Sequence, residues 1–411
     1  MKKSTTIFFF VLIANLSLAQ LSWIRLSDFP GCGKPGVAAV SLNGKGYMGL
    51  GLGTNGMGCT DWYEYNSATN AWTQKASFPS TGRWSTASFV IGNKAYVCTG
   101  AKDVGLSNET WEYDPNTDAW TQKANVPGPV RQNAVAFAID NIGYVGTGYS
   151  ANTTYDDFYQ YDPTTDMWTA IANFPGPTRS GATAFTIGSM GYVGMGNNTN
   201  STSNFQDFYE YNPQTDAWTQ KTDFPLPYVV APTAYSGSAD CYSLCGYYYQ
   251  YSGITHNPLN MLYKYNQASD LWTLSGTFSG LPRGYAGGFA LSNDIYIGGG
   301  GQKNDGSAAS MLTDFWKLSN GLTLRVENPD TYSDFKIIPN PSTHSISFDN
   351  SLHGKEFESM RIFDVSGKFV VEKSISRVDK SFDISFLSNG IYFVELVTVR
   401  GEVLDSRFVK E

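Results

Sequence analysis

The 411-residue chain has few of the residues that build metal centres and acid–base catalytic sites, because it contains only three histidines and five cysteines. Two of the histidines, His344 and His353, lie near the C-terminus, so the long N-terminal part holds only His256. No Ser–His–Asp set, phosphate-binding loop or zinc-ligand spacing is visible. The sequence therefore predicts no catalytic residue, no metal and no cofactor.

Charge is also scarce and of the wrong sign for nucleic acid. Charged residues make up 16% of the chain, and the net charge is −8. Nucleic-acid binding needs a basic surface, so we exclude that class of partner. The cysteines are too scattered for a disulfide-dense scaffold, and most are expected to be isolated thiols. Cys32 with Cys59 is the one pairing that deserves a test.

Long apolar runs are missing after the first residues of the chain. Residues 1–20 combine Lys2 and Lys3 with an apolar run and a small-residue end, which is typical of a signal peptide cleaved near Ala19 or Gln20. No later stretch reaches the roughly 18 apolar residues of a membrane helix. The mature chain is therefore expected to have no transmembrane segment. A lipoprotein anchor is not expected either, because the nearest cysteine is Cys32.

What the chain has in abundance is an aromatic-rich repeat. One phrase occurs at residues 61–72 (DWYEYNSATNAW), 109–120 (ETWEYDPNTDAW) and 157–168 (DFYQYDPTTDMW), and two more copies end at Trp218 and Trp272. The copies are spaced by 48 to 54 residues. Alternating aromatics, a turn rich in Asp, Pro and Thr, and a closing Trp predict a hairpin.

A second block lies between the phrases and predicts another hairpin. Its apolar alternation is interrupted by a two-residue turn, and its second strand often has glycine at both ends, as in residues 143–146 (GYVG). We expect these glycines to let neighbouring backbones approach near a central channel. Four strands per period and six periods predict six blades. The last period lacks its Trp strand, which the N-terminal residues 21–30 (LSWIRLSDFP) are expected to supply.

These blocks resemble kelch repeats over residues 21–320, like the central domain of galactose oxidase. The resemblance implies an all-β fold, a six-bladed β-propeller closed by its N-terminal strand. Copper oxidase chemistry is disfavoured, because it needs several histidine ligands. Secreted kelch sialic-acid mutarotases are the one enzyme class that survives. In that case a carboxylate such as Asp103, Asp156 or Asp305 would move the proton.

The composition changes after the repeats, which predicts a linker at residues 321–334 and a small antiparallel β-sandwich at residues 335–411. Residues 338–341 (IPNP), 362–368 (IFDVSGK), 387–394 (LSNGIYFV) and 407–410 (RFVK) resemble the C-terminal sorting domain of type IX secretion cargo. The resemblance implies export through the periplasm and outer membrane of a Bacteroidetes-like bacterium, to the cell surface or the medium. The secretion machinery would bind residues 335–411. The alternative is an accessory domain that binds ligand.

Alignment of the repeats reveals one column of cations. Five of its six positions carry a cation and the fifth blade has valine; in chain order they are Lys34, Arg83, Arg131, Arg179, Val229 and Arg283. Topology places it on the propeller face that carries the loops between second and third strands, where sites are expected. Together with Trp84 and Tyr285, these cations could hold an acidic peptide or acidic glycan, since guanidinium pairs well with carboxylate. Equally, a repeated arginine could stack on aromatics and tie blades together.

Three functions follow from these patterns. The first is a secreted or surface binding module that is not an enzyme and holds an acidic peptide or glycan over the channel mouth. The second is a mutarotase or other carbohydrate-active enzyme, and the third is a structural adhesin. Tyr247, Tyr248, Tyr249 and Tyr251 could offer flat surfaces to sugar rings or could simply pack within their blade.

Overall fold

The structure is a computed structural model. It describes residues 22–32, 35–151, 153–198, 205–226, 229–230, 233–236, 240–244, 247–250, 255–292, 294–302, 311–319, 337–348, 357–364, 369–375, 381–399 and 403–411. The predicted signal peptide, Lys34 and the predicted linker lie outside these residues. The chain divides into two compact units, Met1–Gly321 and Leu322–Glu411.

Six four-stranded antiparallel sheets form the described part of the first unit, and we number them as blades 1 to 6. From the innermost strand outward they are β2 (Ala38–Leu42), β3 (Lys45–Gly49), β4 (Trp62–Asn66) and β5 (Ala71–Gln74); β7 (Ala87–Ile91), β8 (Lys94–Cys98), β10 (Thr110–Asp114) and β11 (Ala119–Lys123); β12 (Val135–Ile139), β13 (Ile142–Gly146), β16 (Phe158–Asp162) and β17 (Met167–Ile171); β18 (Thr183–Ile187), β19 (Met190–Gly194), β20 (Phe208–Asn212) and β21 (Ala217–Lys221); β23 (Thr233–Ser236), β24 (Asp240–Leu244), β27 (Met261–Asn266) and β28 (Leu271–Thr277); β29 (Gly287–Leu291), β30 (Asp294–Gly298), β31 (Phe315–Ser319) and β1 (Ser22–Arg25).

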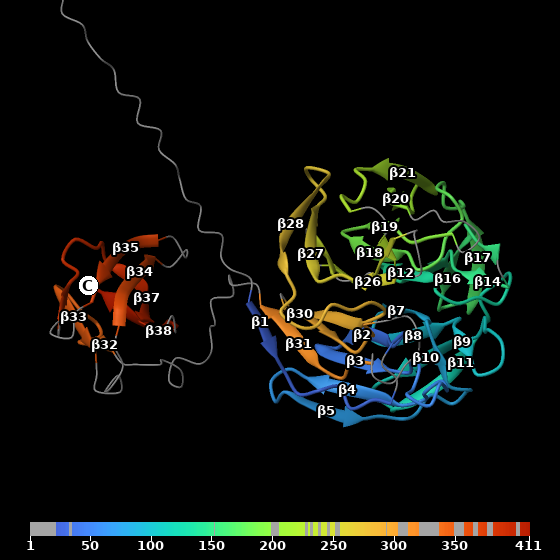
Figure 1. The fold of residues 1–411 in the computed structure, drawn as a ribbon, viewed down its shortest axis with the longest axis horizontal. Coiled ribbons are helices and arrows are strands. Elements are labelled where there is room, and N and C mark those ends of the chain that lie inside the picture. The colour runs from blue at the N-terminus through green and yellow to red at the C-terminus, as the bar shows by residue number, and fades with distance from the viewer. Residues whose placement is uncertain are drawn as a thin grey trace, which may run out of the picture. The chain divides into compact units, whose positions relative to one another are not determined.

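The blades are arranged around a ring (Figure 1). Innermost strands contact each other in the order β2, β7, β12, β18, β23, β29 and back to β2. The N-terminal strand β1 pairs antiparallel with β31, so the first strand of the unit completes the sheet that contains its last strands. The innermost strands thus pack against neighbouring blades while the outermost strands face solvent, and the arrangement is that of an all-β propeller.

The repeated tryptophan makes the same type of hydrogen bond at every junction between blades. Its indole N–H donates to a backbone carbonyl on or just after the outer strand of the preceding blade. The pairs are Trp72 with Ser27, Trp120 with Ala76, Trp168 with Ala124, Trp218 with Ala172, Trp272 with Thr222 and Trp23 with Thr277. Trp23 on β1 therefore occupies the same place in blade 6 as the phrase-ending tryptophans in the other blades.

Glycines in and directly after the second strands make room for backbone, as we expected, and also for aromatic rings of the neighbouring blade. A Cβ atom at Gly148 would lie 2.8 Å from the Gln132 carbonyl oxygen. A Cβ atom at Gly143 would collide with the ring of Phe89, and one at Gly191 with Phe137. In both pairs the phenylalanine belongs to the innermost strand of the preceding blade. The glycine thus leaves space for a large apolar group in the core, where phenylalanine contributes most by its buried area.

One face of the ring carries the segments on which the site depends. We call the segment that leads into an innermost strand the entry segment, and the connection between second and third strands the middle loop. Because consecutive strands are antiparallel, both emerge at the same face, which we call the loop face. Small sheets join the two kinds of segment there: β6 (Arg83–Trp84) with β9 (Ala101–Lys102), and β22 (Val229–Val230) with β25 (Tyr247–Gln250) and β26 (Thr255–Pro258). Blade 3 adds the hairpin of β14 (Tyr149–Ser150) and β15 (Thr153–Thr154).

The second unit contains two antiparallel sheets. One is β32 (Ile337–Ile338), β33 (Ser345–Phe348) and β36 (Phe382–Asp383); the other is β35 (Phe369–Ser374), β34 (Phe357–Asp364), β37 (Gly390–Thr398) and β38 (Val403–Lys410). Ile346, Met360, Val394 and Phe408 are fully buried in its core. Within the described residues, the structure contains no helix that is long and apolar enough to cross a membrane.

Candidate binding face

The four arginines of the predicted column are buried inside their blades. The side chains of Arg83, Arg131, Arg179 and Arg283 are 0% exposed. Each pairs with a carboxylate that lies directly before the third strand of the same blade. The pairs are Arg83 with Glu109, Arg131 with Asp157, Arg179 with Asp207 and Arg283 with Asp314. We call this link between entry segment and third strand the arginine clasp.

Arg179 shows how completely a clasp uses its guanidinium group. Nη1 and Nη2 donate to the two carboxylate oxygens of Asp207 at 2.8 and 2.6 Å. Nη1 also donates to the Met195 carbonyl at 2.9 Å, and Nε donates to the Pro177 carbonyl at 3.0 Å. The guanidinium carbon lies 4.4 Å from the ring centroid of Phe174, so its face is covered as well.

The other clasps repeat this geometry. Arg131 and Arg283 bind both carboxylate oxygens of Asp157 and Asp314, whereas Arg83 binds one oxygen of Glu109 and adds the hydroxyls of Ser80 and Ser107. Bidentate pairs of this kind fix orientation as well as charge. Because these donors are already used within the chain, the geometry favours a structural role, in which each arginine ties the entry segment of its blade to the third strand of the same blade.

Hydrogen bonds and charge pairing lower the pKa of two of the clasp carboxylates, Glu109 and Asp314. Burial alone would raise the pKa of Glu109, but hydrogen bonds from Trp111 and Arg83 outweigh it and lower the pKa to about 2. Burial would likewise raise the pKa of Asp314, but the Arg283 guanidinium and the Trp316 indole lower it below the ordinary aspartate range. These two carboxylates, Glu109 and Asp314, therefore stay charged near neutral pH.

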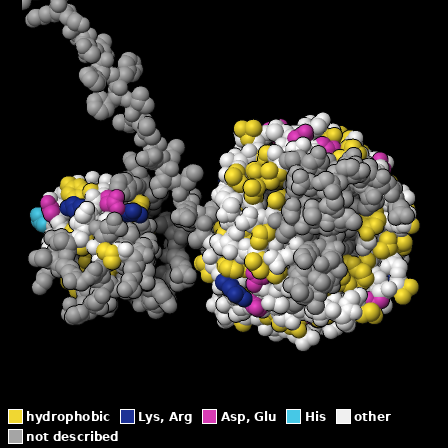
Figure 2. Space-filling view, in the orientation of Figure 1, with side chains coloured by type: hydrophobic (Ala, Val, Ile, Leu, Met, Phe, Trp, Pro, Cys, Tyr) yellow, Lys and Arg dark blue, Asp and Glu magenta, His cyan; other side chains and the backbone are white. Residues whose placement is uncertain are grey.

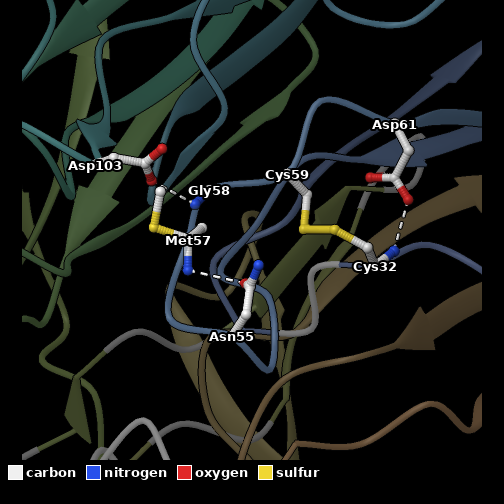
Figure 3. The surroundings of a disulfide bond; sticks show 7 residues. All are labelled: Cys32, Asn55, Met57, Gly58, Cys59, Asp61 and Asp103. Atoms are coloured by element: carbon white, nitrogen blue, oxygen red, sulfur yellow. Dashed lines mark hydrogen bonds between the residues drawn. A yellow bond between two sulfur atoms is a disulfide. The ribbon is translucent and has the colours of Figure 1, made fainter.

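Blade 1 is held by a disulfide instead (Figure 3). Cys32 lies two residues before Lys34, and Cys59 lies two residues before Asp61, so the bond joins the entry segment to the middle loop. This is the pairing that the sequence singled out for a test, and the structure contains it instead of the isolated thiols that we expected. The Cys32 N–H also donates to Asp61 Oδ2. The two sulfurs and this carboxylate lie within 4.8 Å of each other, as the ligands of a metal ion would. Both sulfurs are bonded to each other in the disulfide, however, and have no thiolate to offer a metal. We assign this group to structure.

A cavity of about 220 Å³ lies at the centre of the ring, between the first residues of the innermost strands. Its lining residues come from five blades and include Val37, Ala39, Ser85, Thr86, Ser88, Asn133, Ala136, Thr183 and Tyr285. Among the described residues that line it, none carries a charge. The Thr86 hydroxyl oxygen is buried and has no hydrogen-bond partner within the described structure. The oxygen itself is not exposed to the cavity, so a ligand reaches it only after the Thr86 side chain turns.

Backbone hydrogen bonds form a belt along the part of the cavity rim that belongs to blades 6, 1, 2, 3 and 4. Each link joins the entry segments of neighbouring blades: the N–H of Gly36 donates to the Tyr285 carbonyl, Ser85 to Gly36, Asn133 to Ser85, and Gly181 to Asn133. Tyr285 takes the left-handed conformation, with φ of 53°, to join the belt. This part of the rim is therefore fixed by the backbone.

The structure separates the predicted site residues. Tyr285 lines the cavity, whereas the four arginines do not. Trp84 lies on β6 beside the cavity lining and is half-buried, and Lys34 lies outside the described residues. Sequence reasoning missed Thr86 and Asn133. Their signal was weak, because only their position two or three residues after an aligned arginine marks them.

The carboxylates named for a mutarotase are placed elsewhere. Asp103 Oδ1 accepts the N–H of Gly58 from the neighbouring middle loop, as Figure 3 shows. Asp156 does not line the cavity, and Asp305 lies outside the described residues. No described carboxylate is thus in position to exchange a proton with a molecule in the cavity.

Comparison with known protein families identifies two regions. Residues 11–181 match the family described as KLHDC2/KLHL20/DRC7 Kelch-repeats domain. Residues 336–411 match the secretion system C-terminal sorting domain. No curated protein matches the chain.

Among solved structures, 608 chains match, and one of them is titled "Structure of YjhT". That chain is 18% identical, aligns with a TM-score of 0.61, and the match covers 71% of this chain and 95% of that one. At this identity the likeness supports the fold alone.

Proposed function

We propose that this protein, a kelch-repeat propeller exported to the cell surface or beyond by a type IX sorting domain, is a binding module whose ligand enters the central cavity from the loop face. The observation that carries the proposal is the cavity itself. It is lined by hydroxyl, amide and phenol groups without a described charge, and one of its hydroxyls has no partner. Ligand sites are typically concave, preformed and lined by a few convergent polar groups.

The rigidity of the rim supports binding rather than catalysis. The backbone belt holds the entry segments together, and the clasps and the disulfide hold the middle loops against them. A preformed rim reduces the conformational entropy that a ligand must overcome. In this proposal the arginines support the site without touching the ligand, which is held by uncharged groups such as Thr86 and Tyr285.

The surface agrees with a ligand that is recognised mainly without charge. On the face drawn in Figure 2, described Asp, Glu, Lys and Arg side chains of the first unit form only scattered spots between uncharged and apolar atoms. The proposed ligand is therefore a molecule rich in hydroxyl or amide groups.

The test is an array of neutral glycans, acidic glycans and acidic peptides probed with the mature full-length chain and with Thr86→Val. In this proposal the Thr86 side chain turns its buried hydroxyl toward the ligand when the ligand binds. Valine keeps the shape of threonine and removes the hydroxyl, so we expect about fivefold weaker binding, the effect of one hydrogen bond. Stability should stay equal or rise slightly, because the lost hydroxyl has no partner in the unliganded protein.

Thr147→Val is the matched control. The Thr147 hydroxyl is also buried and without a partner in the described structure, but it does not line the cavity. We expect that variant to bind like the parent and to melt like Thr86→Val. Binding that requires an acidic group, or that is the same in all three proteins, would contradict the proposal, as would the absence of any ligand.

A further inference from the structure

The four-stranded sheet of the second unit has one face in the core and one outer face. In β34, β37 and β38 alternate residues point into the core, among them Met360, Val394 and Phe408. The residues between them point to the outer face, because successive side chains of a strand alternate. Such a face normally presents polar side chains to water. Arg361 fits this rule, since it forms an exposed ion pair with Glu372 at 2.9 Å.

Another part of the outer face is apolar. Four side chains form it, and we call them the apolar patch: Phe363, Ile391, Phe393 and Val409. Phe363 lies directly opposite Phe393, and Ile391 lies directly opposite Val409. Directly opposite residues share a face, as do residues two apart on one strand. The patch therefore extends without a break over β34, β37 and β38, which are neighbours in the sheet (Figure 1).

The patch leaves apolar area in water. Ile391 is 44% exposed and Val409 is 36% exposed, and the two phenylalanine rings are partly buried. Contact with an apolar partner would remove this area from water, which is favourable. An apolar centre beside charged side chains is also the usual composition of a protein interface. The outer face thus has the make-up of a contact surface.

The patch brings together three of the segments by which the tail resembles sorting domains. Phe363 belongs to residues 362–368, Ile391 and Phe393 belong to residues 387–394, and Val409 belongs to residues 407–410. Residues 336–411 match the sorting-domain family, which implies a partner in the secretion machinery for this unit. Segments that are distant in the chain therefore meet at one surface of a unit that the machinery recognises.

We propose that the apolar patch is the surface by which a component of the type IX machinery, through an apolar surface of its own, holds the folded tail. The inference goes beyond the proposed ligand-binding function and does not depend on it. Size favours this occupant over a second copy of the chain. A stable dimer needs about 20 to 30 residues from each partner, whereas the patch has four side chains. A small contact suits cargo that must be released after export.

The first test is export of the full-length protein from a bacterium with a type IX system, measured as the ratio of protein outside the cell to protein in the periplasm. Ile391→Lys/Val409→Glu replaces the exposed pair of the patch by opposite charges, which keep the two strands paired. Because charges are costly to bury against an apolar surface, we expect the ratio to fall about tenfold or more.

Val399→Lys/Phe386→Glu is the matched control. It introduces the same two charges into the same unit outside the patch, at apolar residues that are 56% and 54% exposed. The export ratio of this variant should stay within about twofold of the parent, as expected for surface substitutions. Both variants are first compared with the parent by thermal melting, so that lost export is not lost folding.

The second test keeps the chain almost unchanged. A photoreactive phenylalanine analogue replaces Phe393 in one version of the full-length protein and Phe386 in the other. Irradiation of cells during export should crosslink position 393 to a component of the type IX machinery, identified by mass spectrometry, and should not give this product from position 386. If the patch variant melts below the parent, this crosslink decides alone.

Each other outcome overturns the proposal. Export of the patch variant at the ratio of the parent would mean that the machinery does not use this surface, and an equal loss in the control would mean that the patch is not special. Crosslinks from position 393 only to the propeller of the same chain, or only to a second copy, would identify a different occupant. Neither test involves the cavity, so the proposed function stands or falls separately.

Discussion

Blade 1 and blade 3 both link the entry segment to the chain near the start of the third strand, but by different kinds of bond. In blade 3, Arg131 joins the entry segment to Asp157 at the start of the third strand. In blade 1, a covalent bond between Cys32 and Cys59 joins the entry segment to the middle loop just before Asp61. Both links prevent the loop face from opening. An exported protein can use either, because disulfides persist in oxidising surroundings.

An ion pair and a disulfide depend on different solution conditions. A clasp gains from charge pairing and from hydrogen bonds that one guanidinium makes to several partners. It is independent of redox state and fails when its carboxylate is protonated or one partner is removed. A disulfide constrains the unfolded chain, is independent of pH in this range, and fails only when it is reduced. The two blades therefore predict opposite sensitivities.

The largest effect is expected from Arg131→Ala. The substitution leaves Asp157 without its partner and the carbonyls of Pro129 and Thr147 without a donor. Removing one member of a buried pair typically costs 3–5 kcal/mol, so the free energy of unfolding should fall by about 4 kcal/mol. Urea unfolding followed by tryptophan fluorescence measures it.

Arg25→Ala is the control for this prediction. Arg25 pairs with Asp28 at the surface, with side chains 58% and 46% exposed, so its loss should change stability by less than about 0.5 kcal/mol. If Arg131→Ala unfolds like Arg25→Ala and instead loses ligand, the arginines contact the ligand, and our architectural interpretation of the clasps is wrong.

A somewhat smaller effect is expected when the disulfide of blade 1 is removed. The bond links residues 27 positions apart, for which loop-closure entropy gives about 3.5 kcal/mol. Cys32→Ser/Cys59→Ser should therefore unfold at correspondingly lower urea concentration. A reductant should destabilise the parent by the same amount and leave the double variant unchanged. A reductant that lowers the stability of both proteins equally would show that another bond matters.

Acid should act on the clasp and spare the disulfide. The pKa of Glu109 falls from about 4.5 in the unfolded chain to about 2 in the fold. A lowered pKa contributes stability above pH 4.5, and this contribution is lost as the pH falls from 4.5 to about 2. Glu109→Gln should cost about 2 kcal/mol at pH 7, as expected for hydrogen bonds to a charged group.

The measurement is the free energy of unfolding of the parent and of Glu109→Gln between pH 7 and pH 2. The difference between the two proteins should shrink below pH 4.5 and vanish near pH 2. Cys32→Ser/Cys59→Ser serves as the comparison, since its difference from the parent should not change with pH. A gap between parent and Glu109→Gln that persists unchanged at pH 2 would mean that the carboxylate charge is not what stabilises blade 2.

The repeat made most of the fold predictable, because the same alternation recurs in every period. Local patterns marked the hairpins, and the unpaired Trp23 pointed to the strand that pairs with β31. Close backbone approach was predicted correctly at glycines such as Gly148, but the aromatic neighbour of Gly143 was missed. Their alignment shows that space is needed, but only the packed structure shows that a phenylalanine of the adjacent blade fills it.

The site was less predictable, because a column of arginines does not say what it contacts. A second column held that information: the carboxylates before the third strands are present where the arginine is present, and both are absent in blade 5, which has Val229 and Met261 at these positions. Positions that change together usually touch. The cavity, by contrast, arises from how closely the innermost strands of different blades approach, and no single repeat encodes that distance.

The smallest predicted effect would convert blade 1 into a blade of the other kind. Lys34 aligns with the clasp arginines, and Asp61 aligns with their carboxylates. Lys34→Arg, made in the background Cys32→Ser/Cys59→Ser, therefore supplies the guanidinium group that a clasp needs. Guanidinium can bind carboxylate with two hydrogen bonds where ammonium offers a point charge. We expect recovery of about 1 kcal/mol of the free energy of unfolding, within the range of one charged hydrogen bond. The same Lys34→Arg change in the disulfide-bonded parent should add nothing, because the bond already holds the segment. Equal gains in both backgrounds would show that the disulfide and the clasp are not alternatives.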